Sequence, residues 1–390
     1  MLLPSTLHSA ARTEKGISVF STRRPLPICR KAAMMLLDSQ KFYKKWLEDI
    51  SDCQSIGNGH VQHTAPFMGG GGGPAGWGGA IAVVPYEMYK IYGDKETFRR
   101  YLPKILRYFD YLDSRSSGGL VCREEEGGWC LGDWCPPEQI TICEPFVNTA
   151  LYVKQMMMTK EASEAIGESE TAAMLEKRIE EKKQAILNAY YSPQTGSFIG
   201  DAQGANSFAI DIGLGGERAF NNTKKKYDAA DAFDTGIFGT DILTRVLFER
   251  GCADTAFHLL TSTGKGSFYN MKKQGATTIW ENWDGERSHS HPMFGAVTRY
   301  LFSFILGITQ EKNSAGYEKI VIAPQIPDGL NCASGHITTV RGEIAVSFVR
   351  TEREMDFYVT VPQKAWFTYG SDCEYELWKG ENHIHIDFEE

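Results

Sequence analysis

The chain changes from helical to strand-like patterning near residue 315, and this change limits the folds that it can adopt. Before that point apolar residues recur at helical spacing and strand signals are nearly absent. After it, short runs rich in β-branched and aromatic residues are separated by Gly, Pro, Asn and Asp, as in an antiparallel sandwich. These runs are residues 320–322, 337–340, 344–348 and 357–361. Helices followed by strands predict two parts, one helical and one a small antiparallel β-sandwich.

We therefore divide the chain into an irregular start at residues 1–31, a helical domain at 32–312 and a sandwich domain at 313–390. About nine or ten helices are expected, and loops carrying Gly-Trp and Gly-Asp-Trp lie between them. Helical hairpins in a ring would bring such loops together at one end, around a pocket. A complete ring of this kind has twelve helices, so the sequence predicts a barrel that is incomplete at its N-terminus. The expected helices lie near 32–50, 81–93, 95–112, 145–160, 170–190, 205–214, 238–250, 252–262 and 291–306.

Charge, apolar stretches and cysteine spacing exclude several classes of function. A formal net charge of -8 without a long basic run argues against nucleic acid, which requires a concentrated cationic surface. The N-terminus has no continuous apolar segment of signal-peptide length, and no stretch approaches a membrane span, so we expect a cytoplasmic protein that needs no membrane partner. The nine cysteines form no framework of disulfide or metal-binding spacing, so we expect free thiols, no metal and no cofactor.

The tryptophans suggest a carbohydrate ligand. Core filling explains most of the aromatic residues, which make up 12% of the chain, but several tryptophans stand beside glycines and carboxylates. A flat indole next to hydrogen-bonding carboxylates suits a sugar, which has an apolar C–H face and a rim of hydroxyls.

Glu281 is the strongest candidate for catalysis. Glycosidases commonly need one protonated and one ionised carboxyl, and Glu281 has Asp284 three residues on. Trp280 and Trp283 flank it, and we expect Trp280 to line the sugar pocket. An indole beside a carboxyl restricts its hydration, which raises the pKa, whereas neighbouring donors lower it. The alternative is that Glu281 only caps or pairs within the structure.

Further candidates lie on both sides of Glu281. His289 and His291 lack a third ligand at a recognisable spacing, so a metal site is rejected and His291 is expected to bind a sugar hydroxyl. In the segment before Cys135, Asp133 and Trp134 pair an acceptor with a stacking ring, and Trp129 offers a second ring. The alternative for this segment is a Gly-Asp turn with a buried tryptophan.

Several motifs in the same order resemble the bacterial α-L-rhamnosidases of glycoside hydrolase family 78. The resemblance covers roughly residues 32–370 and rests on independent segments. These are 58–61 (NGHV), 66–67 (PF), 76–78 (GWG), 92–94 (YGD), 132–134 (GDW), 236–240 (GIFGT), 275–285 (GATTIWENWDG), 291–297 (HPMFGAV) and 316–324 (GYEKIVIAP).

The resemblance implies an (α/α)6 barrel followed by a small β-sandwich, and hydrolysis of terminal α-L-rhamnosyl residues with inversion. It implies that Glu281 is the general base that activates water, and that His291, Trp77 and Trp134 contact the sugar. Asp133 and Trp129 are added to this site from their positions in the chain.

The start of the chain departs from the family pattern. The family carries its general acid in an Arg-x-Glu-Arg/Lys segment that leads into a Gly-Asp motif. Residues 12–16 (RTEKG) echo the first part, which makes Glu14 the candidate acid, but the Gly-Asp motif does not follow. We therefore expect a truncated or scrambled start. A non-catalytic sugar-binding remnant is the alternative function, and a barrel glycosidase acting on glucosides fits the motif order less well. The expected ligand is a small rhamnoside, and the sequence leaves the oligomeric state open.

Overall fold

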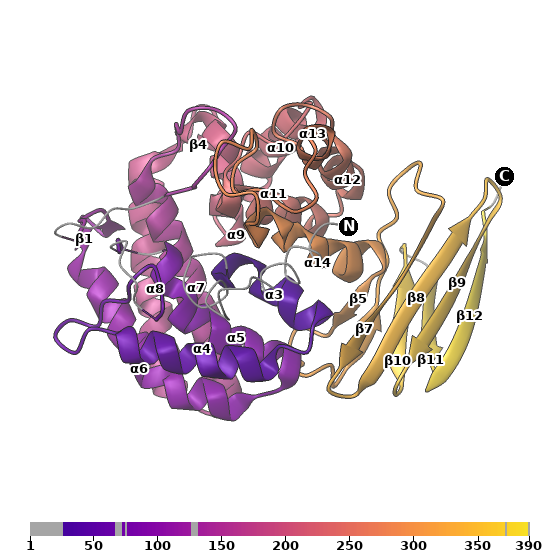
Figure 1. The fold of residues 1–390 in the computed structure, drawn as a ribbon, viewed down its shortest axis with the longest axis horizontal. Coiled ribbons are helices and arrows are strands. Elements are labelled where there is room, and N and C mark those ends of the chain that lie inside the picture. Colours follow the sequence, from indigo (N-terminus) through magenta and orange to yellow (C-terminus); the bar gives the residue numbers. More distant parts are fainter. Residues whose placement is uncertain (1–25, 67–71, 75, 126–131, 371–372, 389–390) are drawn as a thin grey trace.

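The computed structural model describes residues 26–66, 72–74, 76–125, 132–370 and 373–388. Figure 1 shows a rounded helical part on one side and a β-sandwich on the other, with the sandwich formed by the last fifth of the chain. The predicted fold class, an α/α barrel followed by a small sandwich, is confirmed. No helix among the described residues is both long enough and apolar enough to cross a membrane.

An inner ring of helices forms the centre of the barrel (Figure 1). Each inner helix packs on the next, and α3 also packs on η3, so the inner ring closes within the described residues. The sequence predicts an incomplete barrel, but this inner layer has no gap. Its members are α3 (Leu26–Leu36), α5 (Ala80–Tyr92), α7 (Glu144–Ile166), α9 (Ala205–Asp211), α11 (Ile237–Glu249), and η3 (Pro292–Val297), which continues into α14 (Thr298–Tyr300) and η4 (Leu301–Ile305).

Outer helices cover this ring and are amphipathic. In α4 the buried side chains Tyr43, Trp46, Leu47 and Ile50 recur every three or four residues, which places them on one face. The inner helix α5, in contrast, is buried along most of its length. The outer helices among the described residues are α4 (Gln40–Cys53), α6 (Lys95–Ser114), α8 (Ser169–Tyr190), α10 (Gly216–Asp228) and α12 (Ala253–Thr261), with the short α13 (Phe268–Lys273) after them.

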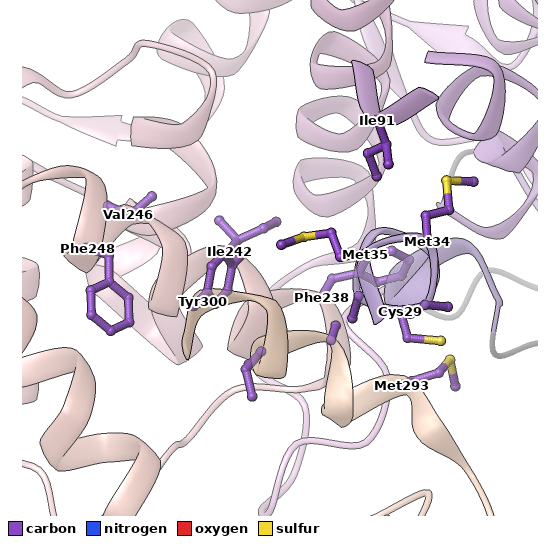
Figure 2. Packing of buried hydrophobic residues seen from close by; sticks show 14 of the residues in the cluster. Cys29, Met34, Met35, Ile91, Phe238, Ile242, Val246, Phe248, Met293 and Tyr300 are labelled. Carbon is purple, nitrogen blue, oxygen red and sulfur yellow. The ribbon is translucent and has the colours of Figure 1, made fainter. Parts of the chain in front are cut away.

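Helix α3 corrects the predicted irregular start. The sequence predicts no regular structure through residue 31, but α3 begins at Leu26. Pro27 suggests a break, yet it lies in the first turn, where its missing N–H would have no helical partner anyway. Met34 and Met35 of this helix join side chains of α5, α11 and η3 in the apolar core, as Figure 2 shows. The flexible thioethers suit an irregular space where side chains of several helices meet.

The sandwich consists of two four-stranded sheets. Their inner faces meet at Phe357 and Phe367, whose ring centres lie 4.9 Å apart. Pairing is antiparallel except between β6 and β10, which run parallel, and β5 comes from a segment that our sequence division places in the helical part. One sheet has the order β11 (Cys373–Leu377), β10 (Ala365–Tyr369), β6 (Ile320–Ile322) and β5 (Ile308–Gln310). The other has the order β12 (Gly380–Asp387), β9 (Glu354–Val361), β8 (Gly342–Arg350) and β7 (Cys332–Thr339).

Candidate active site

The candidate site residues lie in segments that lead into inner helices. Inner and outer helices alternate along the chain, so the inner helices begin at the same end of the barrel. Trp77 precedes α5 within the single turn η1 (Gly76–Gly79), Trp134 precedes α7, and Glu281 and His291 precede η3. The fold therefore gathers residues from distant parts of the sequence at one end, as the sequence predicts for the loops of a helical ring.

Glu281 is held by neutral donors. The indole Nε1 of Trp134 donates a hydrogen bond to Oε1 of Glu281 at 3.2 Å, and the amide of Ser288 donates to Oε2 at 3.4 Å. The carboxylate is half-buried, and no cationic side chain of the described residues forms an ion pair with it. Two weak donors fix its direction without neutralising its charge.

The loop that carries Glu281 is anchored at several points. The backbone amide of Glu281 donates to the carbonyl of Ser288 at 2.8 Å, and that of His291 donates to the carbonyl of Ile279 at 2.8 Å. Within the same loop Trp283 is fully buried, and its indole donates to the carbonyl of Thr235 at 3.3 Å. Glu281 therefore lies on a loop fixed by backbone pairs and by a core side chain, rather than on an exposed arm.

Trp280 has a partner that the sequence analysis treats as an ordinary loop residue. The imidazole of His289 stacks on the indole of Trp280, with ring centres 4.3 Å apart and planes 14° from parallel. Gly285 has a positive φ of 78°, and a Cβ there would lie 2.4 Å from the Trp280 ring. Trp280 is 6% exposed and His289 covers one face of its ring, so little of the ring is open to a ligand, and its sugar contact stays a prediction.

Asp133 forms hydrogen bonds within the fold. Its carboxylate accepts hydrogen bonds from the amides of Gly236, Phe238 and Gly239 at 2.7, 2.9 and 2.9 Å, and its exposed fraction is 1%. Burial raises the pKa of Asp133 to about 7, while the three amide donors act in the opposite direction. The carboxylate thus caps the beginning of α11, where free amides favour an anion. This geometry favours the Gly-Asp turn alternative over a direct sugar contact.

The same contacts explain two glycines of the motif at residues 236–240. A Cβ on Gly236 would lie 2.4 Å from the carbonyl oxygen of Trp134, and a Cβ on Gly239 would lie 2.5 Å from Oδ2 of Asp133. The amide of Ile237 also donates to the carbonyl of Trp134 at 2.8 Å. The motifs at residues 132–134 and 236–240 therefore pack against each other, and this contact directs Trp134 towards Glu281.

The other predicted residues contribute less direct evidence. Trp77 is 4% exposed and packs on Phe238, with ring centres 5.1 Å apart. His291 is buried at the beginning of η3. Glu14 and Trp129 lie outside the described residues, so the structure says nothing of their roles. The predictions for Trp77 and His291 as sugar contacts stay predictions.

Arg287 is a candidate that the sequence analysis misses. Its guanidinium lies 4.8 Å from the centre of the Trp134 ring, in cation–π range. The available signal is its position six residues after Glu281, because a short loop returns such a residue to the same site. Arg287 is exposed, so its guanidinium is accessible from solvent beside the Trp134 ring.

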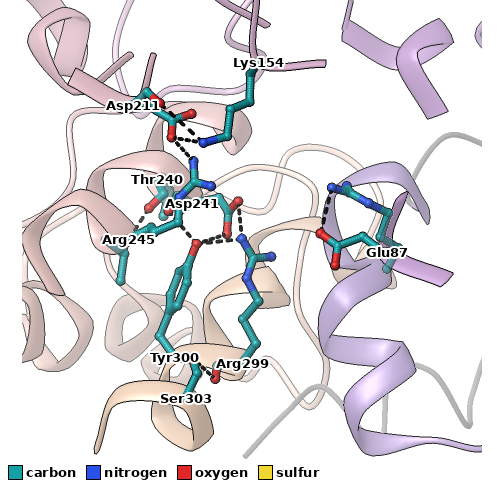
Figure 3. Close-up of polar contacts among 11 residues, drawn as sticks. Glu87, Lys154, Asp211, Thr240, Asp241, Arg245, Arg299, Tyr300 and Ser303 are labelled. Atoms are coloured by element: carbon teal, nitrogen blue, oxygen red, sulfur yellow. Dashed lines mark hydrogen bonds and ion pairs between the residues drawn. The ribbon is translucent and has the colours of Figure 1, made fainter. Parts of the chain in front are cut away.

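The barrel interior contains acids of a different kind (Figure 3). A cavity of about 980 Å³ runs among the inner helices and is lined by charged side chains of both signs. Asp211 is bound by Lys154 and Arg245, each at 2.7 Å. Asp241 is bound by Arg299 at 2.7 Å, and it also accepts a hydrogen bond from the hydroxyl of Tyr300 at 3.0 Å. These carboxylates therefore form ion pairs within the barrel interior.

Comparison with known proteins supports the family suggested by the motifs. Residues 27–305 match the bacterial alpha-L-rhamnosidase six-hairpin glycosidase domain, and residues 307–367 match the bacterial alpha-L-rhamnosidase C-terminal domain. An alpha-L-rhamnosidase from Alteromonas sp. (strain LOR) is 26% identical over 85% of this chain and 38% of that protein. One from Streptomyces avermitilis is 28% identical over 80% of this chain and 30% of that protein. The chain thus spans less than half the length of these relatives.

Solved structures support the fold. The Streptomyces avermitilis alpha-L-rhamnosidase complexed with L-rhamnose superposes with a TM-score of 0.82 at 24% identity, covering 93% of this chain and 38% of that chain. The Dictyoglomus thermophilum alpha-L-rhamnosidase gives 0.84 at 19% identity, over 93% and 45% of the two chains. With both family domains matched in order along most of its length, the chain belongs to the bacterial α-L-rhamnosidases of the six-hairpin glycosidase type.

Proposed function

We propose that this chain hydrolyses terminal α-L-rhamnosyl residues with inversion, and that Glu281 is the general base that activates water. The observation that carries the proposal is the state of the Glu281 carboxylate, which is oriented by the Trp134 indole and is not paired with a cation of the described residues. An ion pair would lower the basicity of the carboxylate, whereas a neutral donor fixes its direction and leaves a free lone pair for water.

The reaction needs a second carboxyl. In an inverting glycosidase the acid and base lie about 6.5–9.5 Å apart, so that a water molecule fits between the base and the sugar. Glu14 is our candidate for the acid that protonates the leaving oxygen. Its role rests on the motif resemblance alone, because it lies outside the described residues.

The sugar is inferred from the relatives. The curated relatives are named alpha-L-rhamnosidases, and the Streptomyces avermitilis enzyme is solved with L-rhamnose. The aromatic and polar groups around Glu281 suit such a ligand, because Trp134 offers a half-buried ring and Arg287 offers N–H donors for hydroxyls. A cytoplasmic location also stays a proposal, which cell fractionation would test.

Glu281→Gln tests the proposed base. The amide keeps the shape of the side chain but cannot accept a proton, so release of nitrophenol from an aryl α-L-rhamnoside should fall by about 10²–10⁴-fold. Rhamnose binding, measured by calorimetry, should stay close to wild type. Glu286→Gln is the matched control, because Glu286 is an exposed glutamate of the same loop and should leave turnover unchanged. Equal turnover in wild type and Glu281→Gln would remove Glu281 from the mechanism.

The wild-type chain itself separates hydrolysis from binding. Release from both an aryl rhamnoside and a rhamnose disaccharide supports a complete acid–base pair. Release from the aryl substrate alone indicates a working base without its acid, because a good leaving group needs less protonation. Rhamnose binding without any release supports the sugar-binding remnant instead. Proton NMR of the first product, taken before mutarotation, tests inversion.

A further inference from the structure

The outer face of the sandwich carries a group of histidines and carboxylates, far along the chain from Glu281. The members come from the neighbouring strands β9 and β12, and alternate residues of each strand point to the same face. His385 lies directly opposite Asp356 in the strand register, and Asp387 lies directly opposite Glu354. His383 precedes them on β12 and stacks on Tyr358. Intervening side chains such as Ile384 are buried, so this face is the solvent side.

His385 occupies the centre of the group. Its Nδ1 lies 2.9 Å from Oδ1 of Asp356, and its Nε2 lies 3.2 Å from Oδ1 of Asp387. Ligand atoms of Glu354, His385 and Asp387 all lie within 4.8 Å of one another. The three side chains are exposed and can move by the small distance that a closer approach requires.

Hydrogen bonds within the group do not balance its charge. Glu354 and Asp387 face each other across the two strands, an arrangement that is unfavourable for like charges. Glu354 forms no ion pair with another side chain in the described part of the protein. Three carboxylates share two imidazoles, so even two protonated histidines would leave a negative charge. A divalent cation held by Glu354, His385 and Asp387 would offset two of the three negative charges while both imidazoles stay neutral.

We propose that Glu354, His385 and Asp387 bind a divalent transition-metal ion of the zinc class. Zinc takes imidazole nitrogen at about 2.0–2.1 Å and carboxylate oxygen at about 2.0–2.2 Å, so tetrahedral ligand atoms lie roughly 3.3–3.5 Å apart. The 3.2 Å between His385 and Asp387 already approaches this separation. Metal-bound histidines typically direct their other nitrogen to a carboxylate, and Asp356 provides that partner. The fourth position is left to water.

The bound ion would tie the two strands together. β12 is the last strand of the described chain and lies at the edge of its sheet, so it is held on one side only. A metal with ligands from both β9 and β12 adds a connection between them. Cysteine and histidine spacings in the sequence predict no metal, because the ligands of this group lie on two strands some thirty residues apart and come together only through the strand register.

Calorimetric titration of the untagged protein with zinc chloride tests the site. We expect one zinc ion per chain and no comparable binding of magnesium, which prefers oxygen ligands. His385→Gln should lower zinc affinity by about tenfold or more, and Asp356→Asn, which keeps all three ligands, by about 10–100-fold. Zinc should raise Tm relative to protein in EDTA for the wild type but not for His385→Gln.

His336→Gln is the matched control, because His336 is an exposed histidine on β7 of the same sheet and lies outside the group. Its zinc affinity should stay within about twofold of wild type, since distant sites act independently. Circular dichroism in EDTA confirms that each variant folds. Absence of stoichiometric zinc binding overturns the proposal, and so does binding that His385→Gln leaves unchanged. Neither result bears on the proposed hydrolysis, which is measured separately in EDTA.

Discussion

Carboxylates in the barrel interior and carboxylates at the end where the inner helices begin have different kinds of partner. In the interior, carboxylates such as Asp211 and Asp241 are bound by arginine or lysine (Figure 3). At the end where the inner helices begin, Glu281 is held by an indole and an amide, and Asp133 by three backbone amides. The same residue types therefore occur in an ion-paired set and in a set held by neutral donors.

This difference distinguishes acids that stabilise the fold from the acid that we propose for catalysis. Arg245 and Lys154 hold the pKa of Asp211 below its usual value, so this carboxylate keeps its charge near neutral pH. Asp133 has no cation of the described residues to offset its desolvation, and burial raises its pKa to about 7 although the three amide donors lower it. Glu281 combines neutral donors with partial exposure, and this combination supports the proposal that it is the general base.

Breaking the ion-paired set should cause the largest loss of stability. Asp211→Asn removes the charge that Lys154 and Arg245 share, and Asp211 is only 3% exposed. Loss of one partner of a buried pair costs about 3–5 kcal/mol in the free energy of unfolding, because the remaining charges stay buried. Urea unfolding followed by circular dichroism measures it.

An exposed pair provides the control. Asp110 pairs with Arg178 at 2.9 Å on the surface, where Asp110→Asn should cost about 0–1 kcal/mol. Similar losses in both variants would contradict the distinction between buried and exposed pairs. Burial alone would raise the pKa of Asp211, but Arg245 and Lys154 outweigh it and lower the pKa. Its stabilising contribution is therefore present above the unfolded pKa and is lost as the pH falls through the folded value.

Asp133→Asn should have an intermediate effect on stability. The asparagine amide would direct donors at amides of α11 that now donate to Asp133, which costs about 1–3 kcal/mol for unsatisfied buried groups. The pH adds a sharper test. Because the folded pKa of Asp133 is raised to about 7, its contribution is complete at low pH and is lost as the pH rises through that value.

The stability difference between wild type and Asp133→Asn should thus be larger at pH 6 than at pH 8, in matched urea titrations. A constant difference across this range would mean that Asp133 is ionised throughout and that the three amides dominate over burial. Glu138→Gln, an exposed change near the same segment, should show no difference at either pH.

Much of the fold follows from periodicity in the sequence. The stripe in α4 and the apolar runs of β8 and β9 carry their period in neighbouring residues, so their type is predictable. Helix α10 is missed, because Gly215, Gly216 and a lysine run suggest a loop. The beginning of α3 is also missed, since Pro27 is as compatible with a first turn as with a break.

The site is predictable only in part. The motif around Glu281 singles out the residue, but its partner Trp134 lies 147 positions away and is found only through the fold. In the sequence Asp133 resembles a sugar-binding residue, because the amides that it caps belong to α11, which is far away along the chain. Distinguishing a cap from a sugar contact requires the three-dimensional neighbours of the carboxylate, which no local pattern supplies.

The smallest expected effect tests the orientation of Glu281. Trp134→Phe keeps a ring but removes the N–H that donates to Oε1 of Glu281. Losing one hydrogen bond to a charged group costs about 1.5 kcal/mol, or roughly tenfold in kcat, while unfolding should change little because the indole is only half-buried. Trp378→Phe makes the same change on the exposed surface of the sandwich and should alter neither quantity. If Trp134→Phe instead lowered stability as much as Asp133→Asn and left kcat unchanged, Trp134 would be a residue that stabilises the fold. The donor that directs Glu281 would then have to be the Ser288 amide.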